Sequence, residues 1–80
     1  MQYEILSRQY HRGASVWHLR LEPYSSSVLP RVGAILWDGV GRRYRVQKPV
    51  GVDPGWTVVR AIDGRYETGP SKDYLTDTEV

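Results

Sequence analysis

Apolar and polar residues alternate along much of this chain, in short runs that are separated by turn-forming residues. The clearest run covers residues 16–22, in which Trp17, Leu19 and Leu21 fall on one side and polar residues dominate the other. A period of two is typical of a β-strand with one buried face. We therefore predict a strand here, with Trp17, Leu19 and Leu21 in the core.

The same reasoning predicts further strands, each bounded by Gly, Pro, Asp or Ser. They cover residues 2–9, 34–37, 43–50, 56–62 and 65–68. Three turn signals support these bounds, because each supplies residues that tolerate positive φ or preset φ for a tight turn: Asp38-Gly39, Asp53-Pro54-Gly55 and Asp63-Gly64.

Strict alternation also predicts which side chains share a face. It groups Tyr3, Ile5 and Ser7 in the first strand; in residues 43–50 it groups Tyr44, Val46 and Val50 on one side and Arg43, Arg45 and Gln47 on the other. No stretch has a convincing helical period. Residues 71–75 have room for one helical turn, with Ser71 as its N-cap.

These elements predict an all-β fold. Five or six short strands with turns at roughly 8–12-residue intervals are typical of a small barrel or sandwich. An SH3-like or OB-like barrel of antiparallel strands is the simplest solution, because closing the sheet hides its edges. We expect one domain over residues 1–70, followed by an acidic C-terminal tail over residues 71–80.

Composition excludes several classes of protein. Hydrophobic residues make up 40% of the chain and charged residues 25%, which argues against disorder. The absence of cysteine excludes disulfides, zinc thiolate sites and a cysteine nucleophile. The sequence has neither a signal-peptide pattern nor a run of the ~20 apolar residues that a membrane helix needs. We therefore expect a cytoplasmic protein that does not bind membranes.

Charge is distributed unevenly along the chain. Residues 1–66 carry ten Arg and Lys against five Asp and Glu, a net charge of +5, while residues 67–80 carry one Lys against four Asp and Glu, a net charge of −3; together they give +2. Nine of the eleven basic residues are arginine, which forms planar bidentate contacts and stacks on rings. The basic excess suits recognition of an anionic partner, although it also simply aids solubility.

Candidate catalytic and metal-binding residues are few. A hydrolytic zinc site needs three protein ligands, and His11 and His18 are the only histidines. A Ser or Asp partner for either histidine would be visible only in three dimensions. The glycine-containing stretch 39–43 precedes a predicted strand, so it lacks the helix that a phosphate loop requires. We expect no enzyme activity, no cofactor, no metal and no small-molecule substrate.

Arginine and tryptophan supply the candidate binding residues. Arg43 and Arg45 share a predicted strand face; the complete set is Arg20, Trp37, Arg42, Arg43, Arg45 and Trp56. An arginine row also protects a sheet from unwanted pairing, which is the purely structural explanation.

The function we expect is that of a non-enzymatic binding module. The leading hypothesis is a protein-interaction protein of the accessory or inhibitor type found among small phage and bacterial proteins, with self-association included. The alternative is a small barrel that binds nucleic acid through its arginine and aromatic surface. The first hypothesis predicts an exposed apolar patch that includes Trp37 or Trp56 and has arginine at its rim. The second predicts a positively charged stripe and salt-dependent affinity.

Overall fold

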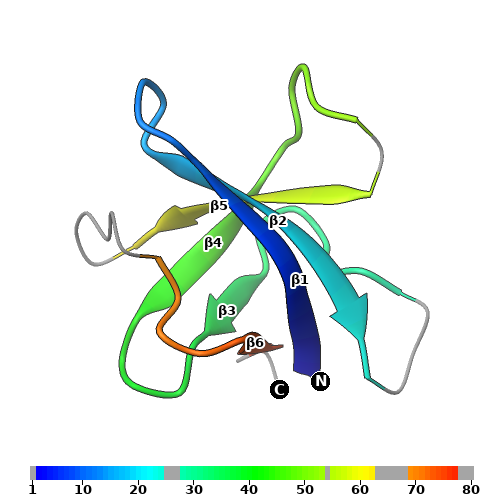
Figure 1. Cartoon of the computed structure of the whole chain (residues 1–80), viewed down its shortest axis with the longest axis vertical. Helices are drawn as coiled ribbons and strands as arrows, with labels where there is room; N and C mark the ends of the chain where they lie inside the picture. The colour runs from blue at the N-terminus through cyan, green and yellow to red at the C-terminus, as the bar shows by residue number, and fades with distance from the viewer. Residues whose placement is uncertain (1, 25–27, 54, 63–68, 78–80) are drawn as a thin grey trace.

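Six antiparallel strands close into a barrel in a computed structural model of the chain (Figure 1). The structure describes residues 2–24, 28–53, 55–62 and 69–77. The strands are β1 (Gln2–His11), β2 (Val16–Pro23), β3 (Ile35–Trp37), β4 (Arg43–Gln47), β5 (Trp56–Ala61) and β6 (Tyr74–Asp77). They follow each other around the barrel in the order β1-β2-β5-β4-β3-β6, and β6 pairs back with β1.

The predicted fold class is therefore confirmed. The chain forms an all-β closed barrel, consistent with a small SH3-like or OB-like barrel, and none of the described residues is helical. The predicted strands at residues 2–9, 16–22, 34–37, 43–50 and 56–62 all correspond to observed strands, with ends that differ by a few residues. The predicted strand at 65–68 and the turn at 63–64 lie outside the described residues.

The core fills the inside of the barrel with alternate residues of the strands. It consists of Tyr3, Ile5, Trp17, Leu19, Leu21, Leu36, Tyr44, Val46, Val59 and Leu75. The prediction that Trp17, Leu19 and Leu21 face the core is thus correct. Because the sequence has no Phe, tyrosine and tryptophan supply the large aromatic volume at the centre.

Strand β1 contains a bulge that the alternation did not predict. The register with β2 shifts between Ile5 and Ser7, which leaves Leu6 as an extra residue. Beyond the bulge the faces are exchanged, so that Arg8 rather than Ser7 comes to the inner side. A bulge bends a strand and increases its twist, which helps β1 follow the curvature of a closed barrel.

Strand β4 is shorter than predicted. It ends at Gln47, two residues before Pro49, which has no N–H to donate to a neighbouring strand. Val50, which the alternation placed on the same face as Tyr44 and Val46, lies beyond the strand and is 80% exposed, whereas those two residues are buried.

The segment predicted to be an acidic tail with a helical turn contains a strand instead. Strand β6 pairs with β1 on one side and with β3 on the other, and so closes the barrel. Leu75 is fully buried in the core, and this burial favours an extended conformation over a helical turn. Residues 78–80 of the predicted tail lie outside the described residues.

A buried aspartate joins the β3–β4 loop to the segment before β6. The carboxylate of Asp38 accepts hydrogen bonds from the backbone N–H groups of Val40 and Arg42, both at 3.0 Å, and from the N–H and hydroxyl of Ser71. Burial would raise the pKa of Asp38, but these hydrogen bonds outweigh it and lower the pKa below its usual value. The guanidinium of Arg42 donates to the carbonyl of Gly69 at 2.6 Å, which reinforces the connection.

Candidate functional site

The outer side of the sheet formed by β2, β5, β4 and β3 carries most of the predicted site residues. Three cross-strand pairs define this surface: Arg20 opposite Trp56, Arg45 opposite Arg60, and Trp37 opposite Arg43. Their neighbours along each strand point into the core, so alternation directs these side chains outward. Five of the six predicted residues therefore lie on the outside of the barrel, distributed over the four strands β2, β5, β4 and β3.

Arg42 is the predicted site residue that lies elsewhere. Its guanidinium is partly buried and donates to the carbonyl of Gly69. Arg42 therefore helps to hold the β3–β4 loop against the segment before β6, away from the outer side of β4.

Trp56 is an aromatic residue of the outer surface that contacts an arginine. The guanidinium carbon of Arg20 lies 4.9 Å from the centroid of the indole, within the range of a cation–π interaction. The indole is half-buried at the start of β5 and borders two separate hollows. Arg20 thus fixes a ring that contributes to both.

The first hollow is an open apolar groove of about 330 Å³, which we name the Trp56 groove. Residues 29–32, which we call its wall, line the groove together with Pro49, Trp56 and Val58. Two backbone hydrogen bonds attach the residues that directly follow this wall to β4. The N–H of Gly33 donates to the carbonyl of Val46 at 2.8 Å, and the N–H of Val46 donates to the carbonyl of Ala34 at 2.9 Å. One end of this wall is therefore anchored to the sheet.

The rim of the Trp56 groove combines exposed apolar residues with arginine. Val32, in the wall, is 60% exposed, and Leu29 beside it is also exposed. The exposed Arg31 lines the same groove, and Arg20 lies over the indole at its end. An apolar centre with a basic rim is the usual composition of a protein-binding patch.

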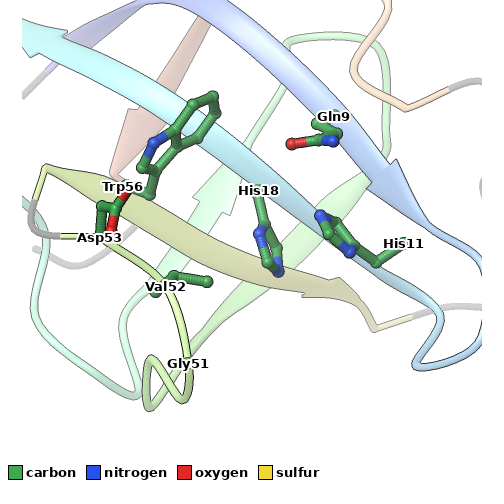
Figure 2. A pocket seen from close by; sticks show the side chains of 7 residues that line it. All are labelled: Gln9, His11, His18, Gly51, Val52, Asp53 and Trp56. Carbon is green, nitrogen blue, oxygen red and sulfur yellow. The ribbon is translucent and has the colours of Figure 1, made fainter.

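The second hollow, which we name the histidine hollow, has a volume of about 320 Å³ (Figure 2). His11 from β1 and His18 from β2 stack with their ring centroids 3.6 Å apart, while Asp53 and Trp56 lie at the opposite end. Burial, and secondarily the proximity of His11, lowers the pKa of His18 below its usual value. This arrangement favours the neutral imidazole at His18.

His11, His18 and Asp53 are the titratable residues that line the histidine hollow. Within the part of the chain that the structure describes, no group of three or more His, Cys, Asp or Glu residues could hold a metal ion. Nε2 of His11 is buried, and none of the described residues forms a hydrogen bond with it.

Arginines gather at the other end of the outer surface, on β4 and β5. The side chains of Arg43, Arg45 and Arg60 point outward there, and Trp37 lies beside them on β3. We name these four residues the arginine face. Nη1 of Arg45 donates to the carbonyl of Gly33, and Nη2 of Arg60 donates to the carbonyl of Ala14, both at 3.3 Å. A neutral carbonyl orients a guanidinium without cancelling its charge.

Sequence reasoning missed two parts of this surface. Arg60 alternates with Val59 and so belongs outside, but only the register shows that it lies opposite Arg45. The wall formed by residues 29–32 looks like an ordinary loop in the sequence, and its contribution to a groove depends on the way it folds against β4 and β5. Val32 and Leu29 were the available signal, as exposed apolar residues beside proline.

Comparisons of the chain with protein-family models, with curated proteins and with solved structures found no match. Among the residues that the structure describes, there is no helix that is long and apolar enough to cross a membrane.

Proposed function

We propose that the chain is a non-enzymatic binding module whose Trp56 groove receives an extended segment of a partner protein. The groove carries this proposal, because it is an open apolar depression with arginine among its lining and neighbouring residues. Exposed apolar side chains such as Val32 gain most when a partner removes them from water.

The dimensions of the groove favour a peptide segment over a small substrate. A volume of about 330 Å³ accommodates a few side chains, and the groove is open to solvent. An extended segment with one or two apolar residues would fill it. Arg31 and Arg20 at the rim favour acidic residues beside the apolar ones, since opposite charges increase both association rate and specificity.

Selection of random peptides displayed on phage, followed by titration of the selected peptides, tests this proposal. We expect the selected peptides to combine apolar with acidic residues and to bind with micromolar affinity. Val32→Glu should weaken their binding at least about tenfold, equivalent to ~1.4 kcal/mol, because it brings a charge into the apolar wall. Amide chemical shifts in an NMR titration should change first at residues 29–32 and at Trp56.

Val50→Glu is the matched control. Val50 is 80% exposed and is not among the residues that line the groove, so the same change there should leave peptide affinity within about twofold. Equal loss in both variants, or chemical shift changes that avoid the groove, would contradict the proposal. A concentration-dependent dimer that only Val32→Glu abolishes would assign the groove to a second copy of the chain instead.

A further inference from the structure

The arginine face contains a pair of like charges that a sheet normally avoids. Arg45 and Arg60 lie directly opposite each other on β4 and β5, on the outer side of the barrel. Residues in such a pair have Cβ atoms about 5 Å apart, and like charges at this distance destabilise the sheet. Arg43 lies two residues along β4 on the same side and adds a third positive charge.

The contacts of the pair spread the two guanidiniums apart without neutralising them. Arg45 reaches the carbonyl of Gly33 on one side, and Arg60 reaches the carbonyl of Ala14 on the other. Both residues are exposed, and the acceptors are uncharged backbone groups. The two cations are therefore presented to solvent at either side of the strand pair, where a chain of anionic groups could contact both.

An exposed indole lies next to these charges. Trp37 is 41% exposed and lies on β3 opposite Arg43, which is two residues along β4 from Arg45. That step is roughly 7 Å in a β-strand, which suits one nucleotide unit of an extended single strand. A base can stack on the exposed ring only if it is not already stacked in a duplex, so the tryptophan favours single strands.

We propose that the arginine face binds single-stranded nucleic acid. The phosphate groups contact Arg45 and Arg60, Arg43 contributes positive charge, and a base stacks on Trp37. This function is additional to peptide binding by the Trp56 groove and uses different residues, so that each can fail without the other.

Fluorescence anisotropy of a labelled oligothymidylate of ~12 nucleotides tests the inference, since barrels of this size contact about 4–16 nucleotides. We expect micromolar or tighter binding at low salt. The affinity should decrease with salt concentration with a log–log slope of about −0.7 for each phosphate contact. A duplex of the same length should bind more weakly, because it cannot place a base on Trp37.

Arg45→Glu makes the test specific, because it should change affinity and stability in opposite directions. The substitution replaces a like-charge pair with an opposite-charge pair, so the melting temperature should rise or stay unchanged. Affinity for the oligonucleotide should nevertheless decrease at least about tenfold, with a shallower salt slope. A merely structural arginine would lower stability when it is replaced and would leave affinity unchanged.

Two controls distinguish the arginine face from general positive charge and from the groove. Lys72→Glu makes the same change in net charge at an exposed position before β6, and it should weaken binding no more than about twofold. Val32→Glu, which changes the groove, should bind the oligonucleotide with near-parental affinity, whereas Arg45→Glu should not. Trp37→Ala should remove the preference for single strands over duplex.

Absence of binding at low salt would overturn the inference, as would equal losses in Arg45→Glu and Lys72→Glu. Equally tight binding of heparin, with no effect of Trp37→Ala, would show that the face recognises polyanions in general and would also overturn the assignment to single-stranded nucleic acid.

Discussion

Gly69 packs so closely against the core that a side chain at this position would overlap a neighbouring residue. It has a φ of +70°, and a Cβ atom at this position would lie only 2.6 Å from Cζ2 of Trp17. Trp17 belongs to the core, so its indole has little space to move away. The segment that leads to β6 can therefore cross the indole only at a glycine.

Gly69→Ala should consequently destabilise the barrel. We expect the free energy of unfolding to fall by about 2–4 kcal/mol, because the methyl group overlaps the indole and the backbone is held in the left-handed region. Chemical denaturation followed by tryptophan fluorescence measures this change.

Gly13→Ala is the corresponding control. Nothing lies within 4 Å of a Cβ atom there, and φ is outside the left-handed region. Its free energy of unfolding should stay within about 0.5 kcal/mol of the parent. Equal effects of the two alanines would mean that Gly69 does not pack against Trp17 as described.

At the scale of single elements, the sequence predicts strands well where one face is apolar and the register is regular. In β2, Trp17, Leu19 and Leu21 alternate without interruption, and both the strand and its buried face are correct. In β1 the apolar Leu6 falls on the polar face and Ser7 falls on the apolar face, so the alternation weakens there, but only the register with β2 shows that the cause is a bulge. Strand β6 is too short for its period to be detected, and its place depends on pairing with distant residues.

The contact between β1 and β2 at the histidine hollow predicts a pH-dependent stability. His11 and His18 stack with centroids 3.6 Å apart, and burial together with the proximity of His11 lowers the pKa of His18 below 6.5. Because the pKa is lower in the folded state, the unfolded chain binds this proton more readily. The contribution to stability is therefore fully present above about pH 6.5 and is lost as the pH falls from there through the folded pKa.

Thermal unfolding of the parent and of two variants at a series of pH values tests this expectation. The melting temperature of the parent should fall as the pH is lowered from ~7.5 to ~5.5, and His18→Gln should flatten that dependence. His11→Gln should remove a smaller part of it, because burial is the larger cause of the shift. An unchanged pH profile in His18→Gln would contradict the assignment.

At the scale of the whole molecule, the two proposed surfaces result from the order of the strands. The pairings of β2 with β5 and of β4 with β5 bring Arg20 to Trp56 and Arg45 to Arg60. The sequence identified most of these residues by type and by alternation. It could not identify the cross-strand partners, because strand order is set by the global closure of the barrel and not by any local pattern.

Closure itself depends on β6, whose two neighbours are β1, at the start of the chain, and β3, near its middle. Strands β1 and β6 lie side by side in Figure 1, and β6 pairs with β3 on its other side. Arg8 fixes the segment before β6 by donating to the carbonyl of Pro70 at 2.6 Å, and the side chain of Leu75 completes the core. Without β6, the facing edges of β1 and β3 would lose their hydrogen-bond partners.

A chain that ends at Asp73 should therefore fail to form a stable barrel, although it keeps the contacts of Asp38 and Arg8 with residues 70–73. Loss of one buried leucine costs about 2–5 kcal/mol, and the opened edges add to this, against a total of roughly 5 kcal/mol for a domain of this size. Near-ultraviolet circular dichroism should show the tryptophan environment lost and thermal unfolding no longer cooperative. A chain that ends at Asp77 keeps all of β6 and should unfold cooperatively near the parental temperature. If the two truncated chains unfolded alike, the barrel would not depend on β6, and the acidic segment would act as the tail that the sequence predicts.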